Sequence, residues 1–161
     1  MNHSVILKEI DIFSQLSDHE RERLQAAIIE ESFAKGTIIF HKHSVGDKFY
    51  IIKAGTVEIR KEAGENRRVT WLARLKQGEI FGEMSFFNEE HHSADAISAG
   101  PGDAELLCIG KSDFNQLMDQ DQALVIKVLR AILRKISLRL RQADEILQFL
   151  LPADHPYRHR A

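Results

Sequence analysis

The 161-residue sequence predicts a mainly β domain with flanking helices, and two observations indicate this fold class. First, short runs rich in β-branched and aromatic residues fill the middle of the chain, at 37–40, 48–52, 56–60 and 68–75. Glycines and turn residues separate these runs, and short strands with a turn every ~8–12 residues are typical of a sandwich or barrel. Second, apolar residues at helical spacing precede and follow this region.

The first helix is predicted by a capping box. The Ser17 hydroxyl can accept a hydrogen bond from the amide of Glu20, and the Glu20 carboxylate can reach back to Ser17. Apolar residues then recur at helical spacing, at Leu24, Ala27 and Ile28. We therefore expect this helix to continue to about Glu31. A second short helix is expected over roughly 111–119, with an inward face formed by Phe114, Leu117 and Met118.

The last third of the chain carries the longest periodic pattern. Apolar residues alternate at spacings of 3 and 4, at Ile126, Leu129, Leu133, Ile136, Leu140, Ala143, Leu147 and Leu150. No glycine or proline interrupts them, so the pattern predicts one helix over 121–151, about 45 Å long at about 1.5 Å per residue. Because a small domain cannot cover that length, we expect the later part to pair with a second copy. The predicted dimerisation residues are Leu129, Leu133, Ile136, Leu140 and Leu147. The alternative is an intramolecular helix that covers the barrel mouth.

Composition limits the possible function classes. Lys and Arg total 22 against 24 Asp and Glu, a formal charge of −2, whereas general nucleic-acid binders carry a basic excess. The single cysteine, Cys108, cannot form an internal disulfide. The first residues lack the apolar core of a signal peptide, and no stretch is apolar enough for a membrane span. We therefore expect a cytoplasmic protein that binds neither nucleic acid nor membrane.

One local pattern is specific. Residues 78–97, here called the cassette, are Gly-Glu-Ile-Phe-Gly-Glu-Met-Ser-Phe-Phe-Asn-Glu-Glu-His-His-Ser-Ala-Asp-Ala-Ile. They resemble the phosphate-binding cassette of cyclic-nucleotide-binding domains, which occur in catabolite-activator-type regulators, cyclic-nucleotide-dependent kinases and gated channels. The runs 12–17 and 45–59 resemble two other parts of that family, in the family's order. The resemblance covers about 7–145 and implies a double-stranded β-helix (jelly-roll) barrel with flanking helices.

The resemblance also implies a ligand pocket. The ligand would be cAMP, cGMP or a related small anion. Gly82 would let the backbone approach the phosphate, Glu83 would accept from the ribose 2′-hydroxyl, and Ser93 would donate to the phosphate. The predicted ligand-binding residues are Gly82, Glu83, Met84, Ser85, His92, Ser93 and Ala94. No cofactor and no metal are expected.

His92 is the main departure from the family pattern, which has an arginine at that position. A charge-assisted hydrogen bond contributes about 1.5–3 kcal/mol, so its loss would weaken binding roughly ten- to hundred-fold. Histidine is mostly neutral at pH 7, so His92 would hold a phosphate weakly and only when protonated. Cyclic-nucleotide binding should then strengthen as the pH falls towards about 6. Alternatively, the pocket binds no nucleotide.

The resemblance favours a regulatory module rather than an enzyme. It would comprise a cyclic-nucleotide-binding-like domain over 1–120, a dimerisation helix over 121–151 and a tail over 152–161. The sequence ends too soon after the long helix for a helix-turn-helix, and the basic residues of that helix are spread around its polar face. We therefore expect a stand-alone ligand sensor that signals to a partner protein through helix movement.

Two alternatives belong to other classes. One is a degenerate, dimeric interaction module that binds no nucleotide. The other is a cupin-like metal-dependent enzyme, because Gly36, His41, His43, Asp47 and Gly55 resemble the first metal motif of cupins. His-X-His on a strand would place both imidazoles on one face, as two metal ligands require. The second cupin motif is not visible around 78–92.

Overall fold

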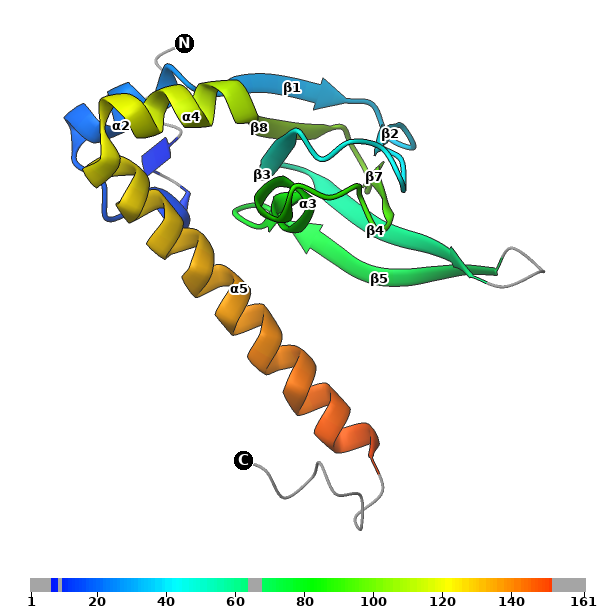
Figure 1. Ribbon diagram of the computed structural model, residues 1–161. Coiled ribbons are helices and arrows are strands. Elements are labelled where there is room, and N and C mark those ends of the chain that lie inside the picture. Colours follow the sequence, from blue (N-terminus) through cyan, green and yellow to red (C-terminus); the bar gives the residue numbers. More distant parts are fainter. Residues whose placement is uncertain (1–6, 9, 64–67, 152–161) are drawn as a thin grey trace.

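The computed structural model describes residues 7–8, 10–63 and 68–151, so the predicted tail at 152–161 lies outside the described residues. The first half contains η1 (Asp11–Phe13), α2 (Asp18–Gln25), β1 (Ile29–Phe33), β2 (Ile38–Phe40), β3 (Lys48–Ala54), β4 (Thr56–Ala63) and β5 (Arg68–Lys76). The second half contains β6 (Ile80–Phe81), α3 (Glu83–Asn88), β7 (Asp95–Ala99), β8 (Ala104–Gly110), α4 (Lys111–Gln120) and α5 (Gln122–Leu150) (Figure 1). The predicted mainly β fold with flanking helices is confirmed.

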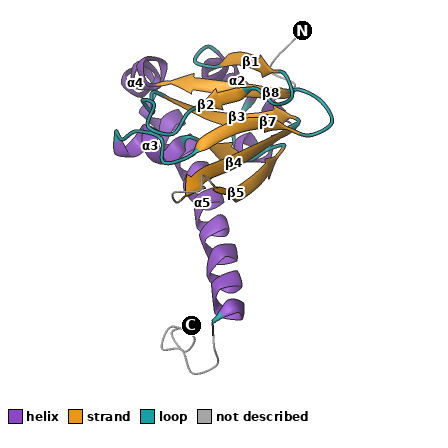
Figure 2. Ribbon diagram, turned by 90° about the vertical axis from the view of Figure 1, so that its right-hand side faces the viewer, coloured by secondary structure: helices purple, strands orange, loops and turns teal. Residues whose placement is uncertain are grey.

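Two four-stranded antiparallel sheets form the centre of the molecule, with strand orders β1-β8-β3-β6 and β2-β7-β4-β5 (Figure 2). Both sheets contribute to one apolar core. Its buried residues are Tyr50, Ile52, Phe81, Ala104, Leu106 and Cys108 from the first sheet and Val57, Leu75 and Ala96 from the second. The two sheets therefore face each other across this core.

A second apolar core lies between the first sheet and the helices. Successive side chains of a strand point to opposite faces, so Phe49 and Ile51 of β3 lie in this helical core while Tyr50 and Ile52 lie between the sheets. β8 divides its side chains in the same way. Burial on both faces explains why these two central strands are almost continuously apolar.

The capping box at Ser17 is confirmed, but the helix that follows is shorter than predicted. α2 ends at Gln25 rather than near Glu31, and Ile29–Phe33 forms strand β1 instead. β1 pairs antiparallel with β8, from Ile29 opposite Cys108 to Phe33 opposite Ala104. This pairing joins segments more than 70 residues apart and outweighs the local helical spacing.

The predicted strands in the middle of the chain are confirmed, whereas the strand placement of His41 and His43 is wrong. β2 ends at Phe40, and both histidines follow it in a segment that contains a turn. His43 has a φ of 68°, so its backbone is not extended. The one-face argument for a pair of metal-binding imidazoles therefore does not apply to this segment.

The two C-terminal helices match their predicted ranges, and the first part of α5 packs on the domain. Its buried residues are Leu124, Val125, Val128 and Ile132, which lie beside the heptad stripe rather than on it. Leu133 and Leu140 of the stripe are 60% and 61% exposed. The C-terminal part of α5 extends away from the sheets in both views (Figures 1 and 2), so this helix can cover the barrel mouth only with its earlier part.

Candidate ligand-binding site

A cavity of about 280 Å³ lies beside α3, and all seven predicted ligand-binding residues line it. Its apolar walls come from β2, β4, β5 and β6, through Phe40, Ile59, Leu72, Ala73, Leu75 and Phe81. The volume is just below the ~300–1,000 Å³ range of ligand pockets. Apolar walls with a few polar groups at one end are typical of sites that hold a small organic ligand.

The bend between β6 and α3 requires a glycine. Gly82 has a φ of 77°, in the left-handed region that side chains other than glycine rarely adopt. A Cβ at this position would also lie 3.2 Å from the Lys48 carbonyl oxygen and 3.2 Å from the Tyr50 ring. The bend places Glu83 and Ser85 at the cavity, whereas Met84 and Ser93 lie at its exposed edge.

His92 is a buried residue of the cavity wall, not an exposed loop residue. Its side chain stacks on Phe40, with ring centroids 3.6 Å apart and an angle of 7° between the ring planes. Its backbone amide donates to the Ser44 carbonyl oxygen at 2.9 Å, and its carbonyl oxygen accepts from His43 at 2.7 Å. The residue is only 5% exposed. These contacts with Phe40, His43 and Ser44 hold the imidazole in one position.

The imidazole is neutral at pH 7. Burial away from solvent lowers the pKa of His92 below its ordinary value of 6.5, although Asp47 acts weakly in the opposite direction. Nδ1 lies 2.7 Å from the Ser85 hydroxyl, which lies 3.2 Å from the Gly82 carbonyl oxygen. This nitrogen is therefore occupied within the protein. Burial and the contact of Nδ1 with Ser85 both disfavour the phosphate-binding cation that the sequence predicts for His92 near pH 6.

Glu83 is buried at the cavity and contacts an arginine that the sequence reasoning did not place there. Arg139 of α5 brings Nη1 to 3.4 Å from Glu83 Oε1 and donates from Nη2 to the Ile80 carbonyl oxygen at 2.7 Å. Burial raises the pKa of the Glu83 carboxyl, and the Arg139 charge partly opposes this rise. Among the described residues that line the cavity, Arg139 is the sole Lys or Arg.

A signal for Arg139 was present in the helix pattern. Val125, Ile132 and Arg139 are spaced by seven residues and lie on one face of α5. The first two are buried against the domain. The next position on that face must also point towards the domain, and a charged residue there needs a polar site to meet. The prediction that the basic residues of this helix lie on its polar face is therefore wrong for Arg139.

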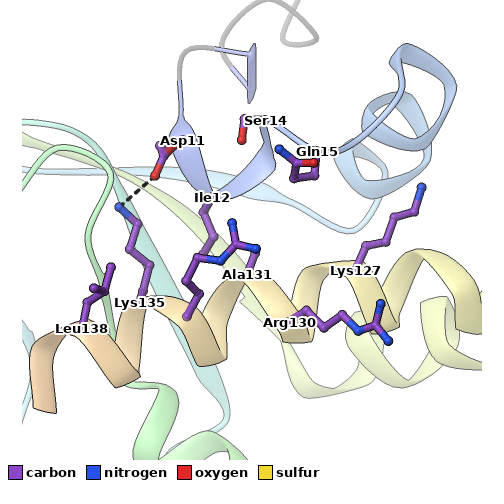
Figure 3. Close-up of a pocket in the computed structure, with 10 residues that line it drawn as sticks. Asp11, Ile12, Ser14, Gln15, Lys127, Arg130, Ala131, Lys135 and Leu138 are labelled. Atoms are coloured by element: carbon purple, nitrogen blue, oxygen red, sulfur yellow. Dashed lines mark ion pairs between the residues drawn. The ribbon is translucent and has the colours of Figure 1, made fainter. Parts of the chain in front are cut away.

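A second, larger hollow of about 400 Å³ lies between η1 and α5. Figure 3 shows Lys127, Arg130 and Lys135 on the α5 side and Asp11, Ser14 and Gln15 opposite them. Lys135 Nζ lies 3.3 Å from Asp11 Oδ2. None of the predicted ligand-binding residues lines this groove.

The cupin-like alternative has no support in the part of the chain that the structure describes. There, no three His, Cys, Asp or Glu side chains lie close enough together to hold a metal ion. His41 Nδ1 lies 3.8 Å from Asp95 Oδ1 at the surface. One histidine and one aspartate are too few to form a cupin-like metal site. The described helices also include none that is both long and apolar enough to cross a membrane.

Comparison with known proteins identifies related sequences. Residues 30–121 match the family described as "Cyclic nucleotide-binding domain". The chain is 32% identical over 145 residues to the cyclic AMP receptor protein of Thermus thermophilus, an alignment that covers 89% of this chain and 63% of that protein. It spans only about a quarter of the length of the cAMP-dependent protein kinase regulatory subunits of Hypocrea atroviridis and Yarrowia lipolytica that it matches.

Solved structures share the fold. A cyclic nucleotide-binding domain from Methylobacillus flagellatus matches with a TM-score of 0.77 at 24% identity, covering 94% of this chain and 84% of that one. The regulatory subunit of a cAMP-independent protein kinase A from Trypanosoma cruzi, bound to guanosine, matches with a TM-score of 0.64 at 25% identity, covering 80% and 43%. With the two facing sheets, these matches confirm the predicted jelly-roll fold.

Proposed function

The chain belongs to the cyclic nucleotide-binding domain family, and from this premise we propose that it is a regulatory module whose cavity beside α3 binds cAMP or cGMP. The observation that carries the proposal is the buried carboxyl of Glu83, 4% exposed, next to the Gly82 bend in a cavity of about 280 Å³. A buried carboxylate needs hydrogen-bond donors, and ribose hydroxyls supply them. The apolar walls suit a nucleobase.

The output of the module is the position of α5, which acts on a partner protein. α5 contacts η1 and α4, and its Arg139 lines the cavity, so occupancy of the cavity and placement of the helix are linked. The exposed stripe of α5 supports a homodimer, because heptad spacing of Leu133, Leu140 and Leu147 is typical of a two-helix seam. A buried free thiol at Cys108 fits the reducing cytoplasm as the site of action.

A second candidate ligand is an uncharged nucleoside, and the state of His92 favours it. The ring is neutral and buried where the family has an arginine, so the cassette itself offers no cation to a cyclic phosphate. The relative from Trypanosoma cruzi with guanosine bound gives this candidate a precedent within the fold. The proposal of a cyclic nucleotide therefore depends on whether another group provides the charge.

Calorimetric titration with cAMP, cGMP, adenosine and guanosine tests the proposal. We expect saturable binding of a cyclic nucleotide, and Glu83→Gln should weaken it about tenfold or more because a charge-assisted hydrogen bond to ribose is lost. His92→Arg should strengthen it at least about tenfold. Glu105→Gln is the matched control, since Glu105 lies on β8, pairs with Lys53 of β3 and does not line the cavity. Flat titrations of wild type and His92→Arg at millimolar ligand would contradict the proposal and leave the degenerate interaction module.

A further inference from the structure

We propose that Arg139 of α5 supplies the positive charge that the cassette lacks at position 92, so that the ligand's phosphate is bound jointly by the cassette and by α5. This inference rests on the proposed cyclic-nucleotide function and names the residue that decides between a phosphate-bearing ligand and an uncharged one. It also makes α5 a wall of the binding site rather than only its output.

The charge balance of the cavity requires such a residue. The ionisable side chains that line it are Glu83, Glu90, His91, His92 and Arg139 among the described residues. The two carboxyl groups favour a negative lining, and the burial of His92 keeps that ring neutral. A cyclic phosphate carries one negative charge, and without a cation it would meet a cavity of its own sign. Arg139 is the residue of this lining that carries a permanent positive charge.

The guanidinium is held where it can exchange partners. Nη2 is anchored on the Ile80 carbonyl oxygen at 2.7 Å, at the strand that leads into the Gly82 bend. Nη1 lies 3.4 Å from Glu83 Oε1, longer than the usual 2.7–3.2 Å of a strong hydrogen bond. Arginine has five N–H donors in a planar fork. One edge can therefore bind a phosphate oxygen while the other keeps its contact with the backbone of β6.

The exchange leaves both charges with a partner. In the unliganded protein the Glu83 carboxylate and the Arg139 guanidinium neutralise each other. When a ligand enters, its phosphate takes the guanidinium, and its ribose hydroxyl donates to the carboxylate that has been released. The Glu83 carboxylate, whose side chain is 6% exposed, is then never left without a donor, while the guanidinium, 37% exposed, also keeps access to solvent. A ligand without a phosphate offers the ribose donor but leaves the Glu83–Arg139 pair in competition with it.

Because Arg139 belongs to α5, binding of a phosphate by this side chain is linked to the placement of the helix. Ile132, one heptad earlier on the same face, is buried against the domain and fixes how the helix is rotated. Arg139 contacts the Ile80 carbonyl oxygen and the Glu79 and Glu83 carboxylates, and the C-terminal part of α5 extends away from the domain (Figure 1). A phosphate that binds Arg139 therefore contacts α5 directly.

The test compares two ligands and two arginines. Calorimetry with cAMP and adenosine is performed on wild type, Arg139→Gln and the matched control Arg141→Gln, an exposed arginine of α5 that is absent from the cavity lining. We expect Arg139→Gln to weaken cAMP binding about 10- to 100-fold and to leave adenosine binding equal or stronger, because Glu83 is released. Arg141→Gln should change neither. Arg139→Lys, which retains the charge without the fork, should give an intermediate loss.

A rescue experiment keeps the test independent of folding. Adding His92→Arg to Arg139→Gln restores a cation at the family's position and should recover most of the lost cAMP affinity. The proposal is overturned if wild type binds cAMP and Arg139→Gln binds it equally well or better, since Arg139 would then only compete for Glu83. Binding of adenosine by wild type without binding of cAMP also overturns it. Absence of binding of either ligand by every variant, including His92→Arg, is the separate result that removes the proposed function itself.

Discussion

Two neighbouring faces of α5 carry apolar residues at the same spacing, but one is fully buried on the domain and the other packs there only partly, through Leu129 and Ile136. Val125 and Ile132 are buried. Leu133, the residue after Ile132, and Leu140, one heptad later, are more than half exposed. The buried face ends in Arg139 at the cavity, and the exposed face continues along the projecting part of the helix. The difference shows that one helix can serve intramolecular anchoring and intermolecular pairing through adjacent stripes.

The largest expected effect is a difference in the free energy of unfolding between variants on the two faces. Replacing Ile132 with alanine removes a fully packed side chain and should lower the free energy of unfolding by about 2–5 kcal/mol. Leu133→Ala, next to it on the exposed face, should cost about 0.5 kcal/mol or less once any dimer is dissociated by dilution. Urea unfolding at low protein concentration measures both. Equal losses in the two variants would show that the faces are not distinct.

The next effect concerns association. Leu140→Glu places a charge on the exposed stripe, and a carboxylate buried in a helix seam is strongly unfavourable, so the proposed dimer should dissociate. Sedimentation velocity should show the change from dimer to monomer, while thermal unfolding of the diluted protein stays the same. Ser137→Glu is a control at an exposed position outside the stripe. A wild-type protein that sediments as a monomer at high micromolar concentration would remove the pairing hypothesis.

Features that depend on neighbours in sequence could be predicted, and those that depend on distant contacts could not. The capping box at Ser17 and the uninterrupted heptads of α5 are local patterns, and both are present as expected. The end of α2 depends on pairing of β1 with β8, which no local spacing encodes. The cassette residues were found because they are consecutive or nearly so, and all of them line one cavity.

Arg139 shows the limit for the candidate site. It lies 56 residues from Glu83 in sequence, and its contact depends on how α5 is rotated on the domain. That rotation is set by burial of Val125 and Ile132 rather than by the more regular heptad stripe. The most regular apolar pattern in the sequence therefore indicates a face that the domain covers only in part. The burial of His92 was missed for a related reason, since it depends on Phe40 from β2.

The smallest expected effect is a pH dependence of stability. It compares the two positions that face the cavity, Arg139 on the helix and His92 on the cassette. Because burial lowers the pKa of His92 in the folded state, the unfolded chain binds a proton there at a higher pH than the folded chain. The contribution of His92 to stability is then complete above its ordinary pKa of 6.5 and is lost as the pH falls through the lower folded value. Wild type should lose stability relative to His92→Gln between about pH 7.5 and 5.5, measured by urea unfolding at each pH. His91→Gln, at the exposed neighbouring position, should follow wild type. A wild-type stability that rises relative to His92→Gln as the pH falls would mean that the imidazole is protonated in the folded protein, and the positive charge of the cavity would then belong to the cassette rather than to α5.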